Sequence, residues 1–107
     1  MRKKHFLCTH TWTNEQARDQ FLNIIGQMTD REYLAAVSTE QAELLQTWLG
    51  QDDFFFCHWF ADSEEAIHSA IELSGTHELI VTLASQVPMV VSSFDLKDTK
   101  LVNISGH

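Results

Sequence analysis

Five side chains that can act as nucleophiles or metal ligands lie in two aromatic-rich stretches, residues 5–12 and 54–60. In chain order they are His5, Cys8, His10, Cys57 and His58. Thiol and imidazole groups support three kinds of site: an activated cysteine, a transition-metal centre, or an apolar pocket with a few polar groups. Each kind requires the side chains to meet in space, so the elements that carry them decide between the three.

Both stretches are predicted to be β-strands. Residues 54–60 contain five aromatic side chains in seven positions, between a polar pair and a helix signal, which is typical of a strand buried on both faces. Strand alternation gives two sets of side chains, each on one face of its own strand. The sets are Phe6, Cys8, His10 and Trp12 in residues 4–12, and Phe54, Phe56, His58 and Phe60 in residues 54–60.

If these strands are antiparallel neighbours with Cys8 opposite His58, the two sets share a face. The candidate ligand-binding residues are then Phe6, His10, Trp12, Phe56, His58 and Phe60. We expect the two imidazoles to orient an aromatic ligand and the aromatic rings to stack on it. This assignment depends on the register, because a shift by one residue moves every side chain to the other face.

Two other kinds of site use the same side chains. A Cys8–His58 pair would be an activated nucleophile, but no orienting acid or oxyanion donor accompanies it, and a buried cysteine usually packs as a small apolar residue. His5, His10 and His58 together would bind a metal, but their spacing matches no known site. No metal and no cofactor is therefore expected, and the catalytic residues, if any, stay unassigned. His68 and His77 are expected at the solvated surface.

The remaining elements follow from capping signals and hydrophobic spacing. A helix is predicted after a Thr13 cap, ending near residue 27, then a weak strand over 32–37, and a second helix from a Ser38 cap to Gly50. A third helix is predicted over 63–74. Residues 77–85 fit either a short helix or a strand, with helix favoured, and Pro88 is expected to open a last strand over 89–96.

This order predicts an α+β fold of the ferredoxin-like βαββαβ type, a split sandwich with an inserted helix. The four-stranded antiparallel sheet would have the order 4-1-3-2, with the helices on one face. The second face then needs a different cover, which predicts a homodimer. The chain is interpreted as one domain, residues 1–96, followed by a polar C-terminal tail, residues 97–107.

Composition excludes several partner classes. The net charge is −8, from 15 acidic and 7 basic residues, without a basic stripe, so nucleic acid and anionic membranes are poor partners. No apolar run approaches the roughly 18 residues of a membrane span, and the start of the chain is too short in apolar residues for a signal peptide. Two cysteines are too few for a disulfide framework, so a reducing, cytoplasmic location is expected.

Three segments resemble the dimeric α/β-barrel superfamily of ferredoxin-like proteins. They are His5-Phe-Leu-Cys-Thr-His-Thr-Trp12, Phe55-Phe-Cys-His-Trp-Phe-Ala-Asp-Ser-Glu-Glu-Ala66 and Val87-Pro-Met-Val-Val-Ser-Ser-Phe94. The resemblance implies a dimeric α/β barrel. The superfamily includes cofactor-independent monooxygenases of antibiotic biosynthesis and metal-binding proteins of the same fold. Likeness to the monooxygenases would place Trp59 and a histidine beside a substrate.

More narrowly, the whole chain is similar to the PigK/HapK accessory proteins of prodigiosin pigment clusters. This similarity implies a cytoplasmic accessory role in making the methoxy-bipyrrole aldehyde half of the pigment. The expected partners are a pyrrole-like aromatic intermediate or a pathway enzyme. A monooxygenase and a metal-binding protein are the alternatives.

Overall fold

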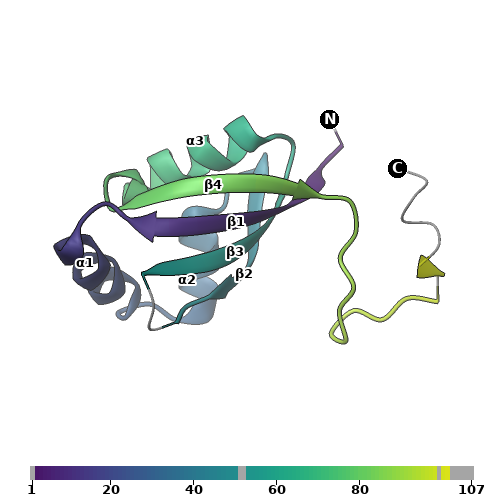
Figure 1. The fold of residues 1–107 in the computed structure, drawn as a ribbon, viewed down its shortest axis with the longest axis horizontal. Helices are drawn as coiled ribbons and strands as arrows, with labels where there is room; N and C mark the ends of the chain where they lie inside the picture. Colours follow the sequence, from purple (N-terminus) through teal and green to yellow (C-terminus); the bar gives the residue numbers. More distant parts are fainter. Residues whose placement is uncertain (1, 51–52, 99, 102–107) are drawn as a thin grey trace.

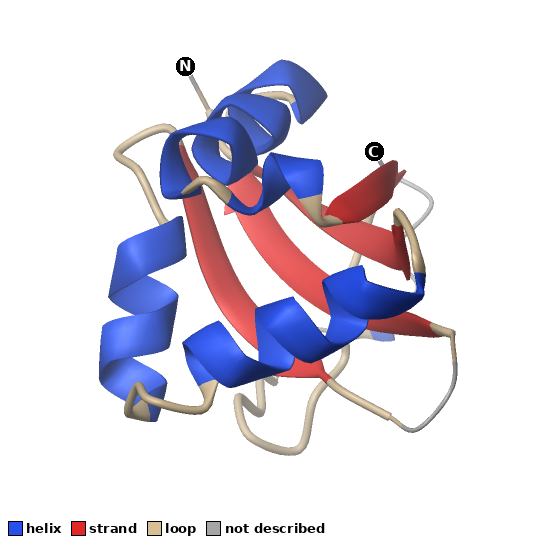
Figure 2. Cartoon of the chain, turned by 90° about the vertical axis from the view of Figure 1, so that its left-hand side faces the viewer, coloured by secondary structure: helices blue, strands red, loops and turns tan. Residues whose placement is uncertain are grey.

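A four-stranded antiparallel sheet with three α-helices on one face makes up most of the computed structural model, which describes residues 2–50, 53–98 and 100–101 (Figures 1 and 2). The elements are β1 (Lys4–Trp12), α1 (Glu15–Ile25), α2 (Asp30–Val37), β2 (Ala42–Trp48), β3 (Phe54–Ala61), α3 (Glu64–Ser74), a 3-10 turn (Thr76–Glu78) and β4 (Ile80–Val87). This confirms the predicted α+β class. The strand order β2-β3-β1-β4 confirms the predicted sheet order.

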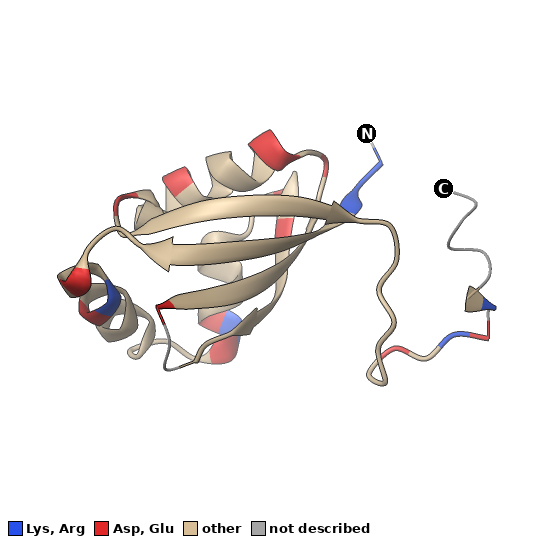
Figure 3. Ribbon diagram, in the orientation of Figure 1, with Lys and Arg blue, Asp and Glu red and all other residues tan. Residues whose placement is uncertain are grey.

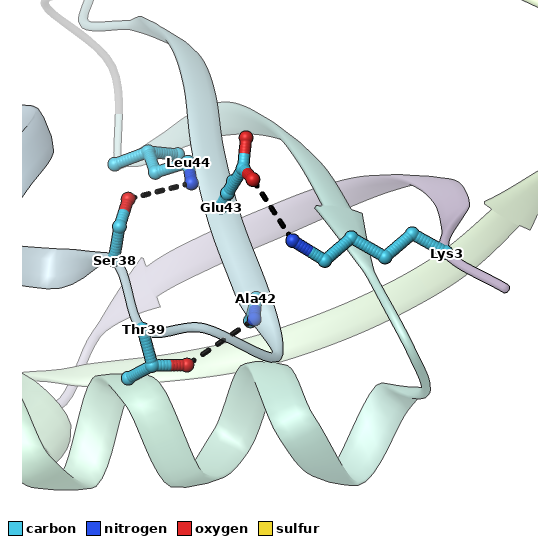
Figure 4. A network of polar contacts seen from close by, with 6 residues as sticks. All are labelled: Lys3, Ser38, Thr39, Ala42, Glu43 and Leu44. Atoms are coloured by element: carbon cyan, nitrogen blue, oxygen red, sulfur yellow. Dashed lines mark hydrogen bonds and ion pairs between the residues drawn. The ribbon is translucent and has the colours of Figure 1, made fainter. Parts of the chain in front are cut away.

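The second predicted strand and the second predicted helix are wrong: the segment predicted as a strand is helical, and the segment predicted as a helix contains a strand. Residues 32–37 belong to α2, because Thr29 and Glu32 form a capping box that starts this helix. The predicted helix from Ser38 to Gly50 contains β2 instead. The Ser38 hydroxyl accepts a hydrogen bond from the Leu44 N–H at 2.9 Å, which helps to fix the start of β2 (Figure 4).

The end of the chain also differs from its prediction. Residues 80–87 form strand β4 rather than a helix, and its full length pairs with β1. The expected strand over 89–96 is wrong, because these residues have no regular ladder. Pro88 thus follows the last strand instead of opening it. We call residues 88–98 the C-terminal arm; it leaves the end of β4 and runs away from the helices (Figure 1).

The helix ends use side chains close to those predicted. Asn14, not Thr13, caps α1 by accepting a hydrogen bond from the Ala17 N–H. Ser63 caps α3, and the predicted helix over 63–74 is confirmed. Gly75 ends α3 at φ 83°, a left-handed conformation that favours glycine. Among the described residues, no helix is long and apolar enough to cross a membrane.

The hydrophobic core lies between the sheet and the three helices. Phe55, Trp59 and Ile67 are each at most 2% exposed and anchor it. Helix α1 contributes Phe21 and α2 contributes Val37. The core is thus complete within one chain and uses only one face of the sheet.

The other face, which we call the open face, carries no helix and little charge. Strands β3 and β4 contain no Asp, Glu, Lys or Arg, and β1 and β2 contain one each (Figure 3). Part of this face is exposed apolar surface, with exposed fractions of 40–69%. We call this part the apolar end, and it consists of Leu7, Phe54, Val81 and Leu83.

Candidate functional site

The register of β1 against β3 differs from the predicted one by one residue. His58 pairs with Leu7, and Cys8 pairs with Cys57. The expected common face is therefore wrong, and the six candidate residues divide into two sets. Phe6, His10 and Trp12 lie on the face that the helices cover, whereas Phe56, His58 and Phe60 lie on the open face.

His10 is a core residue with a satisfied hydrogen bond. It is 1% exposed, its Nδ1 lies 2.8 Å from the Thr82 hydroxyl, and its ring stacks on Phe55 at 4.6 Å. Burial, with a smaller contribution from His68, lowers the pKa of His10 to about 4. This imidazole is therefore neutral at pH 7 and acts as a packing group.

The covered face leaves too little room for a small-molecule ligand. Phe6 is buried, and Trp12 stacks on Phe55 at 4.9 Å. A cavity of about 10 Å³ remains between sheet and helices, with Trp59 and Tyr33 in its lining. This volume holds about one water molecule, far below the roughly 300 Å³ of the smallest typical ligand pockets. The buried Trp59 indole N–H has no acceptor among the described residues and suits such a water.

The predicted cysteine–histidine pair does not form. Cys8 is fully buried on the covered face, and burial, together with Cys57 and Glu64, raises the pKa of its thiol to about 12. His58 lies on the other face of the sheet. Cys8 is thus a structural thiol, because almost none of it is thiolate at neutral pH.

The three histidines considered for a metal site are also separated, since His10 faces the core and His5 and His58 face the opposite way. Within the described ranges, no cluster of three His, Cys, Asp or Glu side chains could hold a metal ion. His68 and His77 are exposed, as predicted, and His68 contacts the Glu64 carboxylate at 3.3 Å.

The open face brings together a pair of histidines instead. The Nδ1 atom of His5 lies 2.8 Å from the Nε2 atom of His58, and the ring centroids are 5.0 Å apart. Phe60 also packs against His5, at 4.7 Å between ring centroids. Sequence analysis missed the partnership because it placed His58 on the face of His10. The alternation of β1 already separates His5 from His10 and was the available signal.

Both imidazoles of the pair are held in the neutral state. Burial is the main cause that lowers the pKa of each. The Lys97 ammonium lowers the pKa of His5 further, and His5 does the same to His58. Nearby, Lys3 lies over the Phe60 ring. Its ammonium pairs with the Glu43 carboxylate at 2.8 Å (Figure 4).

A neutral histidine pair presents one donor and one acceptor to a ligand. Each neutral imidazole carries one N–H, and one of the two protons occupies the bond between the rings. The other proton must then be on an outward nitrogen, and the second outward nitrogen must be an acceptor. Exchanging these roles between His5 and His58 takes two proton movements. The shared proton crosses to the other ring, and that ring loses its outward proton to solvent while the first ring takes one up at its outward nitrogen.

The pair lies in a groove of about 800 Å³, which we call the histidine groove. One wall comes from β2, with Leu45, Gln46 and Trp48, and the other comes from the C-terminal arm. The volume falls within the roughly 300–1,000 Å³ of small-molecule sites. The lining combines apolar side chains with polar and charged ones, including Gln46, Asp95 and Lys97. Of the six predicted residues, His58 alone lines this groove.

Phe56 and Phe60 lie on the same face without lining the groove: Phe60 supports His5, and Phe56 packs edge-on against Phe54 at 5.4 Å. Trp59, the aromatic residue of the monooxygenase alternative, is 1% exposed on the covered face. Comparisons with protein-family models, curated proteins and solved structures find no match, so the geometry of the histidine groove is the basis for a functional conclusion.

Proposed function

We propose that this protein is a homodimeric binding module that holds an uncharged, planar aromatic molecule in the histidine groove. The single observation that carries this proposal is the His5–His58 pair at 2.8 Å in a groove of about 800 Å³. Trp48 supplies an aromatic surface beside the pair. A cationic ligand is disfavoured, because the Lys97 ammonium already acts on His5.

The ligand class follows from the two outward nitrogens of the pair. These nitrogens point away from each other at opposite ends of the pair, so a small ligand bonds to one of them. A pyrrole carbaldehyde can donate its N–H to the outward acceptor or accept at its carbonyl from the outward donor. The similarity to PigK/HapK proteins points to the same class, since it implies a pyrrole-type intermediate of prodigiosin biosynthesis in the cytoplasm. We therefore assign the protein an accessory role in such a pigment pathway.

The homodimer explains the open face. Leu83 and Val81 are 69% and 57% exposed on a sheet face that carries almost no charge. Exposed apolar patches of this kind mark interaction surfaces. A second copy packed face to face would form the dimeric α/β barrel of the ferredoxin-like class and enclose the histidine groove.

Replacing His58 tests the ligand site. His58→Ala removes one outward nitrogen and the partner of His5, so we expect the affinity for pyrrole-2-carbaldehyde to fall about tenfold. The N-methyl analogue lacks the N–H donor, so we expect wild type to bind it about tenfold more weakly than the aldehyde. The His58→Ala variant should bind the aldehyde and its N-methyl analogue with the same affinity. Isothermal titration calorimetry measures both, and light scattering checks that the dimer persists.

His77→Ala is the matched control, because His77 is exposed and lies outside the groove. It should bind the aldehyde as wild type does. Equal affinity of wild type and His58→Ala for the aldehyde would refute the site. Oxygen uptake during turnover of the aldehyde would instead support the monooxygenase alternative.

A further inference from the structure

The C-terminal arm carries large apolar side chains that its own chain leaves uncovered. Val91, Phe94 and Leu96 are 70%, 90% and 82% exposed. The arm has no strand partner, although a turn orders it: the Phe94 N–H donates to the Ser92 hydroxyl, and Lys97 pairs with Asp95. Exposed apolar side chains gathered on one short segment mark an interaction surface.

The apolar end of the open face is the matching surface, but three of its four residues, Phe54, Val81 and Leu83, lie toward the end of the sheet away from the arm. The arm starts after Val87, which pairs with His5, whereas Val81 pairs with Thr11 at the other end of β1. These six residues of strand correspond to about 20 Å. In the structure the arm runs away from the sheet rather than back along it (Figure 1).

We propose that two copies of the chain exchange their C-terminal arms, each arm laying Val91, Phe94 and Leu96 on the apolar end of the partner's open face. This inference rests on the homodimer of the proposed function and adds which segment makes it. The arm stays at the histidine groove of its own chain, where Val91 and Phe94 are among the lining residues. The partner's apolar end then covers the parts of these side chains, and of Leu96, that their own chain leaves exposed, and completes the enclosure of the groove.

The exposed areas suit this exchange. The three arm side chains, the four residues of the apolar end and Trp48 expose roughly 1,000 Å² per copy, if a large side chain presents about 150–250 Å². A stable interface needs about 800 Å² per partner, so these surfaces are sufficient for a dimer.

Crosslinking between two differently tagged copies tests the exchange. One copy carries Phe94→Cys and the other carries Leu83→Cys, while the native Cys8 and Cys57 are buried. After mixing, a short bismaleimide should join the two copies. Leu73 is the control position, because it is 79% exposed but lies on α3, away from the open face. A copy with Leu73→Cys in place of Leu83→Cys should give no crosslinked product. Absence of the interchain product, or a crosslink only within a chain carrying both substitutions, would overturn the proposal.

A second measurement uses the dissociation constant of the dimer. Phe94→Ser combined with Leu96→Ser should raise it at least about 100-fold in analytical ultracentrifugation, whereas Leu73→Ser should leave it unchanged. An unchanged constant for the arm variant would overturn arm exchange.

Failure of this inference is distinguishable from failure of the proposed function. Normal binding of pyrrole-2-carbaldehyde without interchain crosslinks would refute arm exchange alone. Interchain crosslinks without binding of the aldehyde would refute the ligand proposal alone.

Discussion

Phe55→Ala is expected to lower the free energy of unfolding by about 3–5 kcal/mol, because it removes a large ring from a close-packed core. Phe55 is 2% exposed and contacts three other aromatic rings: His10 at 4.6 Å, Trp12 at 4.9 Å and Phe21 at 5.3 Å. The loss is a large fraction of the roughly 5–15 kcal/mol that stabilises a typical domain. Urea unfolding followed by tryptophan fluorescence measures it.

The neighbouring residue provides the control for register. Phe54 is 41% exposed on the open face, so Phe54→Ala should cost about 1 kcal/mol or less when measured at low protein concentration, where association contributes little. If Phe55→Ala does not fold, Phe55→Leu should give a smaller loss in the same direction. Equal losses for the two alanine variants, or a larger one for Phe54→Ala, would show that the strand faces the other way.

Acidification is expected to destabilise the fold by about 3 kcal/mol through His10 alone. The pKa of His10 is about 4 in the folded protein, against 6.5 as its ordinary value. Between these values the unfolded chain binds a proton that the folded chain does not bind, which favours unfolding. The stability that the neutral, buried His10 contributes is therefore fully present above pH 6.5 and is lost as the pH falls through about 4.

His10→Asn isolates this contribution, since an amide can keep a hydrogen bond to Thr82 and does not titrate. Between pH 6.5 and 4, we expect the free energy of unfolding of wild type to fall by about 3 kcal/mol more than that of the variant. Urea unfolding at each pH measures this difference. His77→Gln serves as the control, because His77 is exposed and does not contribute to the lowered pKa of His10. Parallel pH profiles for wild type and His10→Asn would contradict a neutral, buried His10.

The strands and helices with strong local signals were predictable from the sequence. The aromatic run of β3 and the Ser63 and Gly75 caps of α3 identify these two elements directly. Strand β1 is also identified by its alternation. The sheet order follows from the split βαβ pattern and holds even though two of the four strands come from other segments than predicted.

The misassigned segments lack a clear period. The ladder of β2 is irregular between Leu44 and Gln46, and this extra residue breaks the alternation, so its apolar residues fall at helical spacing. Strand β4 buries Ile80 on one face and exposes Val81 and Leu83 on the other, which removes the apolar–polar contrast that marks a strand. The interpretation as a helix followed from these two patterns.

The candidate site was only half predictable, because register depends on contacts between strands far apart in the chain. Local patterns identified His58 as a residue of interest but gave no means to choose between Cys8 and Leu7 as its neighbour. A shift of one residue exchanged His10 for His5 as the histidine beside His58. The groove itself depends on the C-terminal arm, whose path no local pattern specifies.

Long-range proton–nitrogen NMR spectra of the histidine side chains test the ligand site most directly. Adding pyrrole-2-carbaldehyde should shift the ring nitrogens of His5 and His58, because a new hydrogen bond at one ring alters the bond that joins the two rings. The signals of the exposed His68 and His77 should stay in place. Unmoved signals of His5 and His58 at saturating aldehyde would contradict the proposed ligand site.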